Sequence, residues 1–360
     1  MHMCLHFARN PEDGQPKPTD RLFKIRPLID YFNNKMADTY YPDKMLSLDE
    51  SMVLWRGRLT FRQYIKNKRH KYGEKLYIVT EPDGTNIKFA VYTRQLNDFG
   101  GKGHAANVVL HLMENWLDVG HSIYMDNFYN SYDLAIKLLD RQTYCTGTLR
   151  VDRKHTPQEV KSQKLKAGET IARYSNGVLV GKWRDKRDVA YISTEFTNEM
   201  VTYRDKIERE RQKPLPIYMY NKYMGGVDRQ NQLMSYYPCE RKTLRWYKKI
   251  GFHILQMLLL NSYLLFKKFT NSRMSIYDFR LQIVGGLVPE ATGPAPGLRE
   301  NTHHPKKNPQ RPRGKAISRR CTYCFNIRKI RRDTSYHCPA CRNAPYLCLD
   351  ECFTLYHQNL

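Results

Sequence analysis

The stretch of sequence that decides the fold of this chain is Ile123-Tyr124-Met125-Asp126-Asn127-Phe128-Tyr129. In it, a short apolar strand is followed directly by an acidic residue, Asp126. The spacing of apolar side chains predicts one helix before this segment, at residues 108–119, and one after it, at residues 131–140. Before it, residues 45–64 and 74–93 alternate apolar and polar positions, as a strand meander does. Strands followed by a helix–strand–helix unit predict a mixed α/β domain.

The flanking segments extend this domain and interrupt it. Apolar spacing predicts an amphipathic helix at about residues 20–36 and long helical structure at 228–269. Between them, residues 150–215 are polar and rich in lysine, and Asn176-Gly177 predicts a β-hairpin there. We therefore expect a β-rich insertion within the α/β domain.

The charge of the chain indicates a polyanionic partner. Its 360 residues contain 60 Lys and Arg against 35 Asp and Glu, which gives a formal net charge of +25. Contacts to phosphate neutralise such a surplus and release counterions, so the composition favours nucleic acid as the partner. A ribosomal protein or a protein of anionic membranes is the alternative.

The apolar segments predict neither a membrane span nor a secretory signal. The most apolar run, residues 254–266, is interrupted by Gln256 and Asn261 and is shorter than the roughly 20 residues that a span requires. The N-terminal residues lack a basic region followed by an apolar one. Six of the nine cysteines fall between Cys321 and Cys352, a clustering that fits a metal site in a reducing compartment.

Three acidic residues occupy positions suited to binding metal ions. Asp49 follows alternating apolar residues, Asp126 ends a strand, and Asp228 precedes a long helix. Carboxylates from distant parts of a chain can hold two divalent cations about 3.5–4 Å apart for phosphoryl transfer, and Mg²⁺ prefers carboxylate oxygen. Each residue also has an ordinary interpretation, as a turn residue, a strand cap or a helix N-cap. Spacing along the chain does not decide between them.

Four groups of motifs resemble the piggyBac transposase family and occur in its order across residues 18–270. They are Asp20-Arg21-Leu22-Phe23-Lys24-Ile25-Arg26-Pro27-Leu28-Ile29; Leu48-Asp49-Glu50-Ser51-Met52 with Arg56-Gly57-Arg58 and Phe61-Arg62-Gln63-Tyr64; Met125-Asp126-Asn127-Phe128-Tyr129-Asn130-Ser131 with Gly147-Thr148-Leu149-Arg150; and Tyr220-Asn221-Lys222-Tyr223-Met224-Gly225-Gly226-Val227-Asp228 with Arg241-Lys242-Thr243 and Arg245-Trp246.

The resemblance implies an RNase H-like DDE core whose catalytic triad is Asp49, Asp126 and Asp228. In the family this triad binds two divalent metals, Mg²⁺ or Mn²⁺. They support nicking of a transposon end and transfer of the freed 3′-hydroxyl to target DNA, typically at TTAA. We expect an irregular N-terminal segment and then a core that an insertion divides into two parts. The boundaries are 1–19 (irregular N-terminal edge of the domain), 20–149 (first part of the core), 150–216 (insertion domain), 217–285 (last core helices), 286–320 (basic Pro/Gly-rich linker) and 321–360 (zinc-binding domain).

Asn231 departs from the family pattern, which usually has a second acid three residues after the third Asp. On a helix, residues i and i+3 share a face, so Asn231 should still point at the site. Its carbonyl oxygen could bind a metal but brings no negative charge. We therefore expect weaker metal binding than in the family, and more metal-dependent nicking in an Asn231→Asp variant.

Two basic clusters follow the proposed metal ligands and contain aromatic residues. A DNA strand entering a metal site needs such groups, and the alternative is a solvated charged face. The candidate DNA-binding residues are Arg56, Arg58, Arg62, Lys66, Lys68, Arg69, Lys71, Arg241, Lys242 and Arg245.

The spacing of the C-terminal cysteines predicts a zinc module without any resemblance. Two CxxC pairs, Cys321 with Cys324 and Cys338 with Cys341, are typical zinc knuckles. A single site would use these four alone. A cross-brace of two sites would pair the first knuckle with Cys348 and Cys352, and the second with His357 and His337, the candidate eighth ligand. The resemblance favours two ions. A module of about 40 residues depends on zinc for its stability.

We therefore expect a nuclear, piggyBac-like transposase or its domesticated derivative, acting on double-stranded DNA as a homodimer. The alternatives are an inert DNA-binding protein, or a zinc-dependent protein-interaction factor of chromatin. Asn231 favours the inert form, as does the expectation that the family's N-terminal region for dimerisation and DNA contacts is missing. The three aspartates favour an active enzyme.

Overall fold

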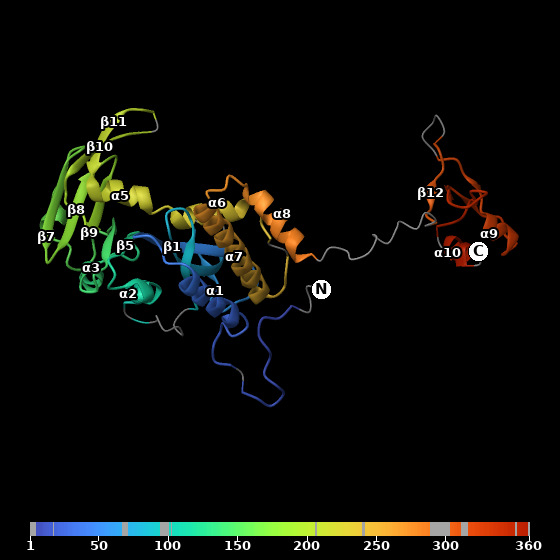
Figure 1. The fold of residues 1–360 in the computed structure, drawn as a ribbon, viewed down its shortest axis with the longest axis horizontal. Coiled ribbons are helices and arrows are strands. Elements are labelled where there is room, and N and C mark those ends of the chain that lie inside the picture. Colours follow the sequence, from blue (N-terminus) through green and yellow to red (C-terminus); the bar gives the residue numbers. More distant parts are fainter. Residues whose placement is uncertain are drawn as a thin grey trace. The chain divides into compact units, whose positions relative to one another are not determined.

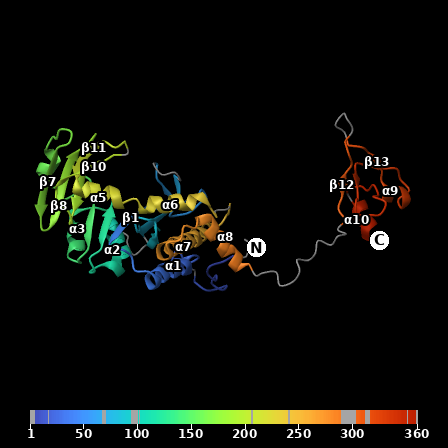
Figure 2. The ribbon, with the colours of Figure 1, turned by 45° about the horizontal axis from the view of Figure 1, so that its top comes forward.

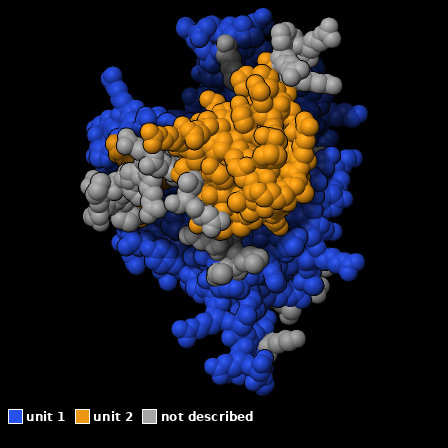
Figure 3. All heavy atoms as spheres, turned by 90° about the vertical axis from the view of Figure 1, so that its right-hand side faces the viewer, with its two compact units in different colours: residues 1–281 blue, residues 282–360 orange. Residues whose placement is uncertain are grey.

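A computed structural model describes residues 5–16, 18–66, 71–93, 101, 103–205, 207–239, 242–288, 303–310, 316–349 and 351–358. The chain divides into two compact units, Met1–Leu281 and Gln282–Leu360 (Figure 3). Each unit is described by itself.

The first unit is a mixed α/β structure that the ribbon shows from blue to orange (Figure 1). Its elements are α1 (Arg26–Thr39), β1 (Met45–Leu54), β2 (Gln63–Tyr64), β3 (Tyr72–Thr80), β4 (Asn86–Val91), α2 (His104–Met113), η3 (Glu114–Trp116), β5 (Ser122–Met125), α3 (Tyr132–Leu139), β6 (Tyr144–Thr148), α4 (Gln158–Ser162), β7 (Thr170–Ser175), β8 (Val178–Arg184), β9 (Asp188–Ser193), β10 (Met200–Arg204), β11 (Glu210–Pro214), α5 (Leu215–Tyr223), α6 (Gly226–Tyr236) and α7 (Trp246–Thr270), followed by α8 (Ile276–Leu287) at the boundary.

One large sheet organises the unit. Its strand order is β2-β3-β1-β5-β6-β9-β8-β7, and β4 pairs with β3. Strand β1 is antiparallel to β3 and parallel to β5, and β5 is parallel to β6. An antiparallel β4-β3-β1 meander joined to parallel β5 and β6 fits an RNase H-like core, so the predicted fold class is confirmed.

The strands of the expected insertion continue this sheet. Strand β9 pairs antiparallel with β6, and β8 and β7 follow it outward. Asn176 and Gly177 have φ of 48° and 74° between β7 and β8. Both values are positive, as a two-residue hairpin turn requires, so the predicted hairpin is confirmed. The boundaries of the segment at 150 and 216 stay predictions.

Helix α7 is the long core helix of the unit. It is long and apolar enough to cross a membrane by length and composition, and 50% of its most apolar window is buried. The two polar residues that interrupt it make buried hydrogen bonds: Asn261 Nδ2 donates to Asn86 O at 2.7 Å, and Gln256 Nε2 donates to Met234 O at 2.7 Å. These bonds tie α7 to β4 and α6, as in a helix packed inside a folded domain.

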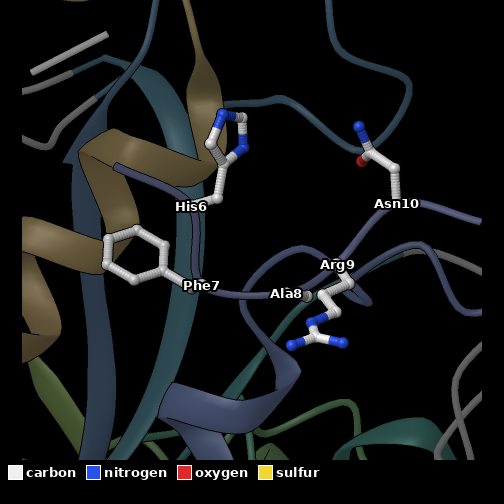
Figure 4. A pocket seen from close by; sticks show the side chains of 5 residues that line it. All are labelled: His6, Phe7, Ala8, Arg9 and Asn10. Carbon is white, nitrogen blue, oxygen red and sulfur yellow. The ribbon is translucent and has the colours of Figure 1, made fainter. Parts of the chain in front are cut away.

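The N-terminal segment lies against α7. Figure 4 shows Phe7 directed toward this helix, beside a cavity of about 410 Å³ lined by residues 6–10. A Cβ added to Gly251 would lie 2.3 Å from the Phe7 ring. Glycine at this position therefore lets the segment approach the helix backbone.

Glu74 is a buried carboxyl group on β3. Its side chain is 0% exposed, and neither carboxylate oxygen has a hydrogen-bond partner among the described residues. Burial raises its pKa from 4.5 to about 9, although Lys249 acts in the opposite direction. The folded protein therefore favours the protonated form far more than the unfolded chain does.

Replacing Glu74 with glutamine is expected to stabilise the protein at neutral pH. Because the folded-state pKa is raised, wild-type stability is complete below pH 4.5 and falls as the pH rises toward 9. The variant should gain about 2–3 kcal/mol at pH 7 and nothing at pH 4. Urea unfolding of both proteins across this range measures the difference, and a constant difference would contradict the assignment.

The second unit is small. Its elements are β12 (Lys306–Lys307), β13 (Arg319–Arg320), α9 (Thr322–Asn326), β14 (Asp333–Thr334), β15 (Tyr336–His337) and α10 (Glu351–Gln358). Strand β12 pairs with β15 and β13 with β14, both antiparallel. Its buried cluster consists of cysteines and Leu347, so apolar side chains alone offer this unit little core.

Candidate functional site

Strand β1 presents Asp49 on its polar face. Leu46 and Leu48 are fully buried in the apolar core, whereas Ser47, Asp49 and Ser51 alternate with them along the strand. Helices α5 and α6 contact β1, and α5 also contacts β5 and β6 (Figures 1 and 2). Asp49 is half-buried in this layer.

Sheet register places Asp126 beside Asp49. Leu48 of β1 pairs with Met125 of β5 in a parallel ladder. Asp49 follows Leu48 and Asp126 follows Met125, so the two aspartates are neighbours. Asp126 Oδ1 accepts a hydrogen bond from Phe128 N at 2.9 Å. Asn130 Nδ2 donates to Met125 O at 2.8 Å and to Thr148 O at 3.0 Å, so its amide joins the ends of β5 and β6 and fixes the loop that carries Asp126.

Asp228 lies on the first turn of α6, and we call the place where Asp49, Asp126 and Asp228 come together the acidic edge. The helix can approach the sheet because residue 226 is glycine. A Cβ there would lie 2.2 Å from Thr80 Oγ1, 2.4 Å from Glu81 O and 2.7 Å from Ser47 Oγ. At the neighbouring Gly225, a Cβ would meet no heavy atom of the described residues within 4 Å. Of the glycine pair, Gly226 is therefore the one that the packing of α6 requires.

We expect Gly226→Ala to destabilise the first unit by about 1–3 kcal/mol, since the added methyl group must push α6 off β1 and β3. Gly225→Ala is the matched control and should change stability by less than about 0.5 kcal/mol. Urea unfolding of the two variants tests this. Equal stabilities would show that α6 does not need the close approach.

Asn231 lies one turn after Asp228 on α6 and contacts β1. Ser51 Oγ donates a hydrogen bond to Asn231 Oδ1 at 2.7 Å. Ser51 is two residues after Asp49 and therefore on the same face of β1. The predicted orientation of Asn231 toward the acidic edge agrees with this contact.

The charges of all three aspartates affect the pKa of Tyr220 on α5. Burial raises the pKa of its hydroxyl to about 12, with additional increases from the charges of Asp126, Asp49 and Asp228 and an opposing hydrogen bond with Thr148. Burial likewise raises the pKa of Tyr129 well above its usual value, with contributions from Glu50, Asp49 and Asp126. The three carboxylates therefore act on one small region, although 77 and 102 residues separate them along the chain.

The donor set at this edge fits hard divalent cations. The three carboxylates come from the middle of β1, the residue after β5 and the first turn of α6, and carboxylate oxygen is the ligand that Mg²⁺ and Mn²⁺ prefer. Asp49 and Asp126 are half-buried and Asp228 is exposed. Regular strands and a helix hold the three aspartates in place, and the exposure of Asp228 leaves the site open to a large substrate.

The described residues of the cysteine module contain two clusters of potential metal ligands. Cys321, Cys324, Cys348 and Cys352 form one, and His303, Cys338, Cys341 and His357 form the other, with the ligand atoms of each cluster within 4.8 Å of one another. The sulfur atoms of Cys324 and Cys352 lie 3.4 Å apart. This is the cross-brace alternative, and four thiolates or two thiolates with two imidazoles suit tetrahedral zinc.

The eighth ligand differs from the sequence prediction. His303 Nδ1 lies 3.2 Å from Cys341 Sγ and 3.4 Å from Cys338 Sγ. His337, the predicted candidate, instead places Nδ1 2.8 Å from Asn308 Oδ1. His337 belongs to β15, and its pairing with Lys306 of β12 directs it to that contact.

Replacing His303 with alanine is expected to lower the zinc content of the protein by one ion, because the second cluster loses a quarter of its ligands. His337→Ala is the matched control and should retain full zinc content. Metal analysis of the purified variants after dialysis measures both. Loss of zinc from the His337 variant alone would reverse the assignment.

The predicted DNA-binding residues lie mainly on exposed loops. Arg56, Arg58, Lys66, Lys71, Lys242 and Arg245 are exposed. Arg62 is half-buried and donates to Arg56 O at 2.8 Å and Gly57 O at 3.1 Å. The ring centroids of Phe61 and Trp246 lie 5.3 Å apart, edge-to-face, so the segments that carry the two basic clusters are in contact there. Lys68, Arg69 and Arg241 lie outside the described residues.

Comparisons with known proteins agree with this architecture. The family model described as Transposase IS4 matches residues 2–263, and the one described as DDE_Tnp_1-like zinc finger matches residues 299–358. The chain belongs to the transposase IS4 family, in its piggyBac-type branch. It is thus a transposase or a transposase-derived protein.

Curated relatives come from the same family, and a solved structure shares the fold. Human PiggyBac transposable element-derived protein 3 is 26% identical over 295 residues, which cover 78% of this chain and 49% of the relative. Human PiggyBac transposable element-derived protein 2 is 24% identical over 280 residues, 72% of this chain and 46% of the relative. The chain therefore spans about half the length of these relatives. A cryo-EM structure of the piggyBac transposase synaptic complex with hairpin DNA shares the fold, with a TM-score of 0.64 and 22% identity over 91% of this chain and 72% of that one.

Several supporting residues carry no signal of their role in the sequence. Asn130, Ser51, Tyr220 and Gly226 lie inside the quoted motifs, but their contacts depend on partners far away in the sequence. His303 follows no spacing rule relative to the cysteines, because it precedes the first knuckle by 18 residues. Only the folded module brings it to Cys338 and Cys341.

Proposed function

We propose that this protein cleaves and joins DNA strands by two-metal phosphoryl transfer, with Asp49, Asp126 and Asp228 as the metal ligands. The observation that carries the proposal is the register of β1 and β5, which makes Asp49 and Asp126 neighbours at the point where β5 ends, while α6 adds Asp228. Membership in the transposase IS4 family supports the same chemistry.

Divalent cations at this edge would supply charge stabilisation to the attacking and leaving oxygens of a phosphodiester. The chain's own residues position that centre. Asn130 holds the Asp126 loop on two strand ends, and Gly226 allows α6 to carry Asp228 to the sheet. Tyr220, whose pKa is about 12, keeps its proton at neutral pH and offers a hydroxyl beside the carboxylates.

DNA would reach the site along the basic surface formed by Arg56, Arg58, Lys242 and Arg245. The contact between Phe61 and Trp246 supports this path, because it joins the two segments that carry these residues. Exposed arginine and lysine bind phosphate without regard to sequence, so this surface supports strand placement rather than base recognition. The similar piggyBac transposase was solved in a synaptic complex with hairpin DNA, which supports DNA as the substrate class here.

The remaining parts of the proposal concern the assembly. We propose that the protein works as a homodimer in the nucleus, that the zinc module binds element ends, and that targets are of the TTAA type. The net charge of +25 and the basic segment 306–320 support nuclear location and DNA contact. Imaging a fluorescent fusion tests the location, and sedimentation with DNA tests the dimer.

A plasmid nicking assay tests the activity. The full chain with Mg²⁺ or Mn²⁺ should convert supercoiled plasmid to nicked circles, and EDTA should stop the reaction. Salt-dependent DNA binding without cleavage would select the inert DNA-binding alternative, which Asn231 favours because it removes one negative charge. Absence of DNA binding would reject both and leave the zinc-dependent protein-interaction alternative.

A further inference from the structure

Asn231 presents the two ends of its amide to different surroundings. Its carbonyl oxygen accepts the hydrogen bond of Ser51 Oγ at 2.7 Å. Ser51 is 3% exposed and lies on β1, so this contact fixes the oxygen against the strand. The amide nitrogen is on the other branch of the same planar group and therefore faces away from Ser51.

Electrostatics favours this orientation. Asp49 is two residues before Ser51 on the same strand face, and Asp228 is one turn before Asn231 on α6. Without bound cations, carboxylate oxygens repel a carbonyl oxygen and attract the positive end of the amide dipole. A serine hydroxyl can donate to the oxygen that is turned away, which satisfies the buried end of the group.

We infer that Asn231 acts as a hydrogen-bond donor to a non-bridging phosphate oxygen of DNA, and not as a metal ligand. This inference rests on the proposed function, because it assumes that DNA enters the acidic edge. The amide places its N–H where the family has a carboxylate. The protein thereby exchanges one metal ligand for one contact with the phosphodiester, and metal affinity comes from the three aspartates.

Two measurements on the full chain test the inference. Isothermal titration with Mn²⁺ in the absence of DNA reports the metal affinity. Fluorescence anisotropy of a 30-base-pair duplex, in Ca²⁺ and in EDTA, reports the metal-dependent part of DNA affinity, which reflects engagement of the acidic edge. Asn231→Ala removes both ends of the amide, whereas Asn231→Asp keeps the size and shape of the side chain, replaces the N–H donor with an oxygen and adds one negative charge.

Asn231→Ala is expected to leave the Mn²⁺ dissociation constant within about twofold of wild type and to reduce the metal-dependent gain in DNA affinity about tenfold. Asn231→Asp should tighten Mn²⁺ binding and lose the same DNA increment. Arg56→Ala, the control, should weaken DNA binding equally with and without metal.

Tenfold weaker Mn²⁺ binding by Asn231→Ala would identify the carbonyl oxygen as a ligand and overturn the inference. An unchanged DNA increment in both Asn231 variants would also overturn it. These results differ from failure of the proposed function, in which the wild-type protein itself would show no metal-dependent DNA binding.

Discussion

Asp126→Asn is expected to lower metal-dependent DNA cleavage by at least about a thousandfold. The substitution keeps the size of the side chain and the acceptor for Phe128 N, but it removes the negative charge from one of the two ligands that sit on adjacent strands. Metal-assisted charge stabilisation contributes several kcal/mol to phosphoryl transfer, and each 1.36 kcal/mol is a factor of ten in rate. Plasmid nicking at saturating Mg²⁺ measures the effect.

The control for this variant is its binding of DNA in EDTA, which should match wild type because Asp126 does not belong to the basic surface. Far-ultraviolet circular dichroism should also be unchanged. A variant that cleaves at the wild-type rate would place the chemistry elsewhere. Asp133→Asn on α3 is the matched surface substitution, since Asp133 lies in the first turn of that helix and not at the acidic edge.

Removal of zinc is expected to unfold the second unit while leaving the first unit folded. Metal analysis should find two zinc ions per chain, because the eight ligands form two separate clusters. Zinc binding contributes roughly 10–16 kcal/mol to the folding of small zinc-finger peptides, far more than the apolar cluster around Leu347 can supply. Cys324→Ser, in the fully buried all-cysteine cluster, should have the same effect as a chelator.

Limited proteolysis reports this unfolding directly. The Cys324→Ser protein should be cleaved within residues 303–358, whereas the fragment containing the large sheet should persist. Cys239→Ser is the control, since Cys239 is an exposed cysteine outside both clusters. A zinc content of one ion per wild-type chain would contradict the cross-brace, and resistance of the chelated protein to protease would contradict zinc-dependent folding.

The acidic edge divides into a part that the sequence predicts and a part that it does not. Alternating apolar residues around Asp49 predict its strand, and the short apolar segment before Asp126 predicts a strand that ends at this acid. Periodicity carries no information on which strands become neighbours, so the separations along the chain left the ordinary interpretations open. The resemblance to the piggyBac family selected the three aspartates, and the register of β1 with β5 gives the physical reason for two of them.

For Asn231, too, the sequence predicts one property and the tertiary structure shows another. The helical interval of three residues predicts that it shares a face with Asp228. Only the contact with Ser51, 180 residues away, shows which end of the amide faces the acidic edge. The choice between a metal ligand and a hydrogen-bond donor depends on that contact, and a chemically ambivalent side chain cannot reveal it by spacing.

By itself, the sequence determined short-range features of this protein: two CxxC pairs with the spacing of zinc knuckles, a surplus of 25 positive charges, and Asp126 directly after a short apolar strand. Local patterns suffice there because ligand spacing and strand alternation are short-range properties. The tertiary structure decided the partners: Asp49 with Asp126, α6 on the sheet through Gly226, and His303 in place of His337. These depend on strand register and close packing between distant segments, which no local pattern encodes.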